Sequence, residues 1–287
     1  MSASTSQYGR GHAWRLGVDY AARIATGAAA LLVIGVLAVI LGYMIYKGAG
    51  SLDLDFFTQL PKPVGEVGGG IMNAIVGSFI MLGLAMVLSV PVGVLAAIYL
   101  SEFGTGWFAQ VLRFLTDVLA GIPSIVVGIF AYTLIVLPMR SFSGFAGGIA
   151  LAIIMLPVVV RTTEEMLRLV PQSLRDGGLA VGAPKWRVTV DIVLASSISG
   201  IATGTLLAVS RAMGETAPLL FTALGSTLWT TSLDKPMASI PVQIYTYSIS
   251  PYDDWHRKAW AAAFTLVVLI LALNVVVRFL TRSKHGS

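Results

Sequence analysis

Six long apolar stretches, separated by polar segments, dominate the pattern of residues along this chain. They cover about 24–46, 73–100, 110–138, 145–163, 198–225 and 259–280. Each is long enough to cross the ~30 Å hydrocarbon core of a bilayer as a helix. A helix also closes its own backbone hydrogen bonds where no water is present. The pattern therefore predicts an all-α polytopic membrane protein with six transmembrane helices.

The first stretch, 24–46, is too long for the core of a signal peptide, and no convincing cleavage site follows it. We therefore expect an N-terminal tail (1–23), one membrane domain (24–280) and a C-terminal tail (281–287). If the N-terminus lies in the cytoplasm, the inner segments carry clearly more Lys and Arg than the outer ones. This bias predicts that both termini are cytoplasmic.

The composition changes little in this picture but excludes several classes of site. Of 287 residues, 56% are hydrophobic and 11% are charged, against roughly 25% charged in ordinary soluble chains. There is no cysteine, so disulfides and thiolate metal sites are excluded, and the three histidines are scattered. We assign no metal site, and the net charge of +5 is interpreted as a topology signal rather than a nucleic-acid surface.

Two outer loops, 47–72 and 226–258, are longer than a simple connection between spans requires. They are rich in aromatic residues, namely Phe56, Phe57, Trp229, Tyr245, Tyr247, Tyr252 and Trp255. Aromatic side chains commonly anchor a protein at the membrane–water boundary. Docking of a soluble outer partner is the alternative interpretation.

The loop between the fourth and fifth spans, about 164–197, is longer and more apolar than an ordinary connection. Apolar residues such as Leu167, Val170 and Leu174 predict short amphipathic helices, separated at Pro171 and at Gly182–Pro184. On the positively charged side of the membrane, such a loop predicts a protein partner to pack against.

Part of this loop, DGGLAVGAPKWRVTVDIVLA, resembles the signature loop of ATP-binding-cassette importer permeases. The matching positions are Asp176, Gly177, Gly178, Gly182, Ile192 and Leu194. Asp stands for the usual Glu, two Gly for two Ala, and Ala195 for Pro, so helix propensity at the start of the motif is weakened. Three further segments, GGGIMNAIVGSF (68–79), RTTEEMLRLVP (161–171) and SRAMGETAPLLFTALGSTLW (210–229), resemble PstA-type permease subunits of phosphate importers.

This resemblance implies a type I importer permease fold with a cytoplasmic coupling helix. It implies that the loop docks onto a separate ATPase through Asp176, Gly177, Gly178, Gly182, Pro184, Lys185 and Ile192. It also implies a second homologous permease (PstC-like), two copies of the ATPase (PstB-like) and a soluble phosphate-binding protein (PstS-like). The chain has no G-x-x-x-x-G-K-[ST] loop, so ATP and Mg are expected on the ATPase and no cofactor on this chain. We expect a transport subunit in a bacterial or archaeal plasma membrane, and not an enzyme.

Two pairs of charged residues are candidates for the substrate pathway. Arg211 and Glu215 lie one turn apart inside the fifth apolar stretch, where a charge is costly unless it meets protein or water. They form either a structural ion pair or an anion station in which Arg211 binds phosphate and Glu215 balances it. The family resemblance ties Arg161, Glu164 and Arg211 to phosphate passage. From spacing alone, the simpler interpretation of Arg161 and Glu164 is an ordinary pair at a span end.

Other charged residues receive a simpler interpretation. We expect Arg113 and Asp117 to pair with each other at a span end, and Glu165 and Arg168 to lie on a solvated helix face. Two alternative functions stay open: a permease for another oxyanion such as sulfate, and an ion-coupled carrier that uses Arg211, Glu215, Arg161 and Glu164 as a charge relay. A carrier, however, has no need of a docking helix.

Overall fold

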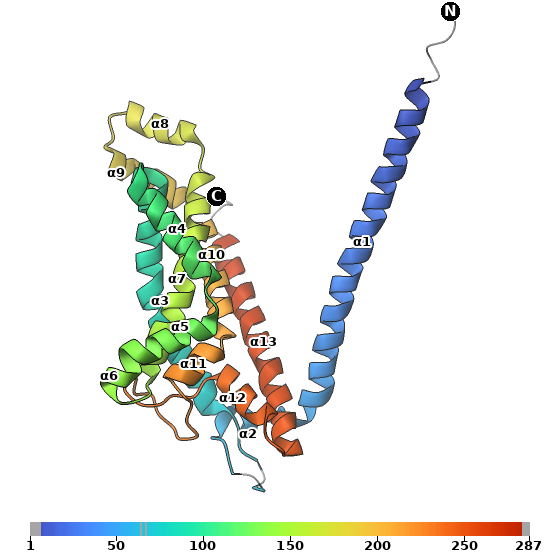
Figure 1. The fold of residues 1–287 in the computed structure, drawn as a ribbon, viewed down its shortest axis with the longest axis vertical. Coiled ribbons are helices and arrows are strands. Elements are labelled where there is room, and N and C mark those ends of the chain that lie inside the picture. The colour runs from blue at the N-terminus through green and yellow to red at the C-terminus, as the bar shows by residue number, and fades with distance from the viewer. Residues whose placement is uncertain (1–6, 64, 67, 283–287) are drawn as a thin grey trace, which may run out of the picture.

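The structure, a computed structural model, describes residues 7–63, 65–66 and 68–282, and within them it is almost entirely helical (Figure 1). Its helices are α1 (Gln7–Gly48), α2 (Leu54–Thr58), α3 (Met72–Ile98), α4 (Trp107–Gly121), α5 (Ser124–Ala131), α6 (Leu137–Met139), α7 (Gly144–Arg168), α8 (Gln172–Ala180), α9 (Lys185–Arg187), α10 (Ala195–Met213), α11 (Ala217–Thr222), α12 (Ile240–Ser248) and α13 (Asp253–Arg282). π-helical segments follow α3 (Tyr99–Phe103), α5 (Tyr132–Val136) and α9 (Val188–Leu194). The all-helical fold is confirmed. Residues 283–287 of the expected C-terminal tail lie outside the described residues.

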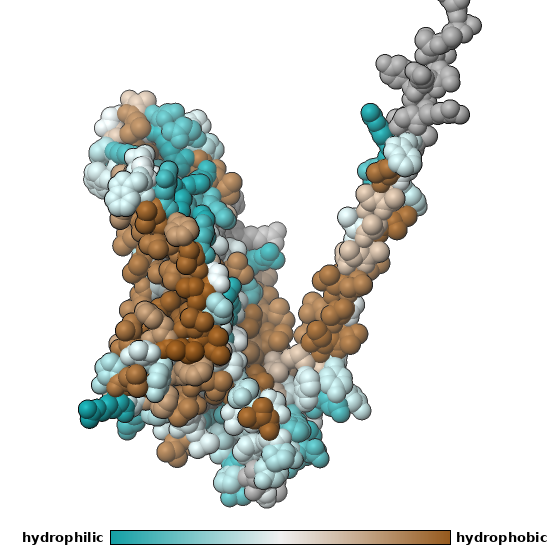
Figure 2. Space-filling model, viewed as in Figure 1, coloured by the Kyte–Doolittle hydropathy of each residue, from teal (hydrophilic) through white to brown (hydrophobic). Residues whose placement is uncertain are grey.

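Five continuous helical stretches are long and apolar enough to cross a membrane. They are Trp14–Ser51, Met72–Phe103, Gly144–Arg168, Lys185–Met213 and Asp253–Phe279. In Figure 2 the apolar side chains form a belt around the middle of the bundle, and polar side chains gather at both ends. Such a belt is what a protein surrounded by lipid presents.

The third predicted span, 110–138, is not one straight helix. Trp107–Gly121 and Ser124–Met139 meet at an angle of 101°. The break lies at Pro123, because proline lacks a backbone donor and forces the preceding residue out of helical geometry. Ile122 accordingly has ψ 131°. The apolar stretch is therefore a bent pair of helices.

The fifth predicted span, 198–225, is displaced along the chain. The helix begins at Lys185 and ends at Met213, and the segment around Pro218 forms the separate short helix α11. Pro218 packs directly on Gly128 of α5, where an added Cβ would lie 2.7 Å from the Pro218 Cα. Pro218, which falls inside the apolar stretch, thus lies at a helix start.

Helices α3 and α7 form the centre of the bundle, and α10, α11 and α13 pack around them. Small residues allow close approach: a Cβ on Gly93 of α3 would lie 2.7 Å from a Val159 methyl of α7. Large apolar side chains, among them Met81, Met155 and Leu219, fill the remaining space. This packing holds α7, which carries Arg161, Glu164 and Arg168 of the charged network described below.

Helix α1 stands apart from the bundle along most of its length, with exposed side chains (Figure 1). It contacts α13 only near its C-terminal end, where the rings of Tyr43 and Trp260 meet edge-on at 5.1 Å. Helix α1 begins, and α13 finishes, on the side of the bundle that carries α8 and α9 (Figure 1). The first and last described helices thus have their free ends on the side of the signature loop, and the cytoplasmic location of both termini stays a prediction.

The aromatic residues of the outer loops divide into two groups. Phe56 and Tyr247 are fully buried in an outer core that includes Ile71 and Ile240, and Trp255 packs on Tyr247 with ring centroids 5.0 Å apart. Anchoring at the membrane boundary is therefore the wrong interpretation for Phe56 and Tyr247. The exposed aromatics Phe57, Trp229, Tyr245 and Tyr252 remain candidates for either role.

Candidate functional site

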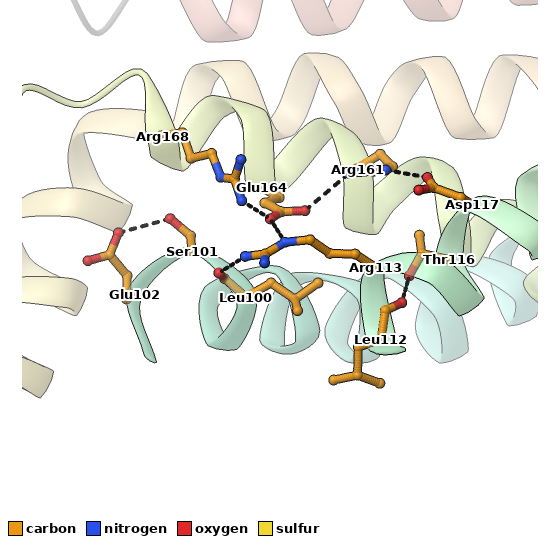
Figure 3. A network of polar contacts seen from close by, with 10 residues as sticks. All are labelled: Leu100, Ser101, Glu102, Leu112, Arg113, Thr116, Asp117, Arg161, Glu164 and Arg168. Carbon is orange, nitrogen blue, oxygen red and sulfur yellow. Dashed lines mark hydrogen bonds and ion pairs between the residues drawn. The ribbon is translucent and has the colours of Figure 1, made fainter. Parts of the chain in front are cut away.

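Glu164 is the centre of a charged network between α4 and α7 (Figure 3). Its side chain is only 2% exposed. Arg113 Nε donates to Glu164 Oε1 at 2.8 Å, and Arg168 donates to the same oxygen at 2.6 Å. Arg161 lies 3.6 Å from the other carboxylate oxygen and also pairs with Asp117. A single buried carboxylate thus gathers three guanidinium groups.

The network corrects two predictions made from spacing. Arg113 and Asp117 do not pair with each other; Arg113 binds Glu164, and Asp117 binds Arg161. Both contacts cross from α4 to α7, because these helices lie side by side at this level (Figure 3). Arg168 is half exposed, as expected of a solvated face, but it is also a partner of Glu164.

These contacts add an ionic attachment of α4 to the apolar packing of Ala109 and Leu112 against α7. Besides Glu164, Arg113 binds the Leu100 carbonyl at 2.6 Å, which links α4 to the end of the α3 span. Three cations face two carboxylates, so the cluster carries an excess positive charge. Its arginines are partly accessible, whereas Glu164 is enclosed. The cluster can therefore attract an anion at its surface while its buried carboxylate stays paired.

Arg211 and Glu215 form the second predicted pair, with Arg211 Nε 3.8 Å from Glu215 Oε1. Arg211 lies in the last turn of α10, and Glu215 lies just beyond the helix end. The pair therefore spans a helix terminus rather than one helix face, and a cation is favourable there. The Arg211 side chain is 51% exposed and that of Glu215 16%. About half of the Arg211 side chain is thus accessible to another ligand.

The two charged groups lie at different depths of the bundle. Helices α7 and α10 pack so closely that an added Cβ on Gly204 would overlap the Thr162 side chain. Arg211 lies seven residues beyond Gly204 in α10, which corresponds to about 10 Å along the helix axis. No contact links Arg211 or Glu215 to Arg161 or Glu164 in the described part of the chain. The structure thus brings the four residues into two separate pairs.

The signature loop folds as its breakpoints predict. Helix α8 ends just before Gly182, whose φ of +83° lies in the left-handed region that favours glycine. The Gly182 amide closes the turn by donating to the Leu179 carbonyl at 2.9 Å. Pro184 then precedes the helix that continues into α10. The spans extend further than predicted at both ends of the loop: α7 runs to Arg168, and the next helix starts at Lys185.

The spacing between Gly178 and Ile192 in the signature motif has a physical cause in this fold. Gly178 of α8 is buried against the segment that leads into α10. An added Cβ there would lie 2.8 Å from Ile192 Cδ1 and 2.9 Å from Val188 Cγ2. At the neighbouring Gly177, no atom lies within 4 Å of an added Cβ. The loop therefore tucks α8 onto Ile192 and leaves Gly177 and Asp176 on the exposed side.

Comparison with known proteins identifies the family. The family model for the binding-protein-dependent transport system inner membrane component matches residues 89–285. The phosphate transport system permease protein PstA of Yersinia pestis is 44% identical over 275 residues, covering 95% of this chain and 93% of the relative. The chain belongs to the binding-protein-dependent transport permeases. PstA of Haemophilus influenzae, at 45% identity over 85% of this chain and 87% of the relative, agrees.

Solved structures support the fold of this permease. The MetNI methionine transporter has a TM-score of 0.57 at 16% identity, covering 75% of this chain and 94% of that one. A bacterial transporter involved in alginate import has a TM-score of 0.59 at 14% identity, covering 95% and 100%. Identities this low speak to the permease fold alone.

Three partners of Glu164 and Arg161 in the charged network are not predicted from the sequence. They are Arg113, Asp117 and Arg168. A signal was present, since Arg113 and Asp117 carry charge in an apolar stretch and need partners there. Among the described residues, no group of three His, Asp or Glu side chains is placed to hold a metal ion.

Proposed function

We propose that this chain is the membrane-spanning permease subunit of an ATP-driven importer of inorganic phosphate. The observation that carries this conclusion is the 44% identity to a phosphate transport permease over 95% of the chain. The fold also has a short helix, α8, outside the apolar belt; its proposed role is to dock on an ATPase, which a carrier driven by an ion gradient does not need. The chain is a multi-pass membrane protein and a transport subunit.

Permeases of this family work together with a second permease, an ATPase and a binding protein. For this chain we propose a PstC-like permease, two PstB-like ATPases that bind ATP and Mg, and a PstS-like phosphate-binding protein. Helix α8, with Asp176, Gly182 and Lys185, would dock on the ATPase. The membrane is then the plasma membrane of a bacterium or archaeon, with both termini cytoplasmic.

The proposed path for phosphate passes Arg211 and then the Arg161–Glu164 cluster. Arg211 is half exposed inside the apolar region of the bundle, where a permanently charged guanidinium can bind an oxyanion through two parallel hydrogen bonds. Glu215 would hold Arg211 when no anion is present. The positive excess around Glu164 offers a second station nearer the docking helix.

The decisive experiment replaces Arg211 by alanine in the complete transporter, reconstituted in proteoliposomes with its binding protein. We expect phosphate uptake to be abolished while the complex assembles and hydrolyses ATP. Arg23→Ala is the matched control, because Arg23 is exposed on α1 and, among the described residues, forms an ion pair only with Asp19 of its own helix. Normal uptake by Arg211→Ala would rule out the anion station.

Two further measurements address the alternative functions. Unlabelled phosphate should compete with labelled phosphate for uptake, whereas sulfate should not; the reverse would favour a permease for another oxyanion. Uptake should survive a protonophore as long as ATP is present. Collapse of uptake under these conditions would favour an ion-coupled carrier.

A further inference from the structure

A buried ion pair joins the docking helix to the α3 span. Arg175 of α8 binds Glu102 through two parallel contacts, Nε to Oε2 at 3.2 Å and a terminal nitrogen to Oε1 at 2.7 Å. Their side chains are only 13% and 6% exposed. Glu102 lies in the π-helical segment that continues α3, and Figure 3 shows it beside the Glu164 cluster. A bidentate pair of this kind fixes direction as well as distance.

Arg175 also holds the end of α7. Its guanidinium donates to the Leu167 carbonyl at 2.8 Å and to the Val170 carbonyl. These carbonyls lie at the C-terminal end of α7, where helix geometry leaves acceptors without partners. One side chain of α8 is thus bonded to both central spans, α3 and α7.

Elsewhere, α8 is only loosely packed against α3. An open cleft of about 450 Å³ lies between them, lined by residues that include Ser101, Glu102, Gln172 and Arg175. The other firm attachment of α8 is the apolar contact of Gly178 with Val188 and Ile192, which leads to α10. A push on α8 therefore reaches α10 through apolar packing, and it reaches α3 and α7 through Arg175.

We propose that the Arg175–Glu102 pair is a strut that transmits movement of the docking helix to the α3 span during transport. Both are positioning residues, since neither needs to touch phosphate or ATP. The proposal rests on the proposed function, in which an ATPase moves α8. Without the strut, α8 still packs on the segment leading to α10 through Gly178, and the ATPase still hydrolyses ATP. The α3 span, however, no longer moves together with α8.

The test compares Glu102→Gln, Arg175→Gln and the double variant in the complete reconstituted transporter. Each single change removes the ion pair from one enclosed charge, so the unfolding temperature is expected to fall. In Arg175→Gln, the Glu102 carboxylate keeps, among the described residues, only its contact with Ser101 and its interaction with Lys185. The double variant leaves no unpaired charge, so its unfolding temperature should return toward that of the parent. Phosphate imported per ATP hydrolysed should nevertheless stay about tenfold below the parent, the factor that corresponds to one lost charge-assisted hydrogen bond.

The outcomes separate a strut from a merely structural pair. Arg23→Gln, which removes an exposed arginine from a local pair on α1, should leave both readouts unchanged. A double variant with the parent's ratio of phosphate to ATP would overturn the strut, and so would a double variant that fails to assemble. If the parent itself hydrolyses ATP without importing phosphate, the proposed function fails and the strut with it.

Discussion

Glu164→Gln removes the charge at the centre of the network while nearly preserving the side-chain volume. The bond from Arg113 is largely shielded from water, and a charge-assisted hydrogen bond of this kind contributes about 1.5–3 kcal/mol. Arg161 and Arg168 are more exposed, so water replaces most of what they lose, and each adds at most about 1 kcal/mol. We therefore expect a loss of about 1.5–5 kcal/mol in the free energy of unfolding.

Glu165→Gln is the matched control, because it makes the same chemical change one residue away at an exposed position. Its effect should stay within about 0.5 kcal/mol. The assay is thermal unfolding of the complex in lipid nanodiscs, combined with hydrogen exchange of the α4 amides, which should accelerate only in Glu164→Gln. Equal unfolding temperatures and equal α4 exchange in the two variants would refute the ionic attachment of α4.

Three further predictions follow from packing and backbone geometry. Gly182→Ala should destabilise the end of α8 by about 1–2 kcal/mol because φ is positive there, whereas Gly177→Ala should stabilise α8 by up to about 1 kcal/mol. Hydrogen exchange of the α8 amides measures both effects. A change in the same direction in the two variants would contradict the different roles given to these glycines. Gly178→Val should displace α8 from Ile192 and reduce ATP-driven uptake. Adding Ile192→Ala should restore part of the uptake, and no restoration would argue against this contact. Phe56→Ala should lower the free energy of unfolding by about 3–5 kcal/mol, because it leaves a cavity in the outer core. An unchanged unfolding temperature would show that this core does not contribute to stability.

Four of the prolines within the apolar stretches show where prediction from sequence stops. Pro91 and Pro157 lie inside continuous helices, α3 and α7. Pro123 breaks its stretch by 101°, and Pro218 stands in the first turn of α11. Hydropathy is similar around all four, so the sequence predicts that each stretch is helical in lipid. It does not predict which proline bends a helix and which ends one, because neighbouring helices decide that.

The candidate site shows the same division. The breaks at Pro171 and Gly182–Pro184 could be predicted because they depend on local backbone chemistry. The partners of Arg113 and Asp117 could not, since a spacing of four residues allows a local pair and a pair with another helix equally well. Only the packing of α4 beside α7 selects Glu164 and Arg161. The contact of Gly178 with Ile192 could likewise not be predicted, because it depends on how α8 folds back onto the segment before α10.

The bend at Pro123 also bears on how the protein is made. Helix α4 has 15 residues, about 22 Å in length, which is shorter than the ~30 Å hydrocarbon core. It also carries Arg113 and Asp117, and charges of either sign disfavour insertion of an isolated helix. Their partners Glu164 and Arg161 belong to α7, which is synthesised later. We therefore expect α4 to enter the membrane fully only after α7 has arrived, so that biogenesis of this bundle does not follow the order of the chain.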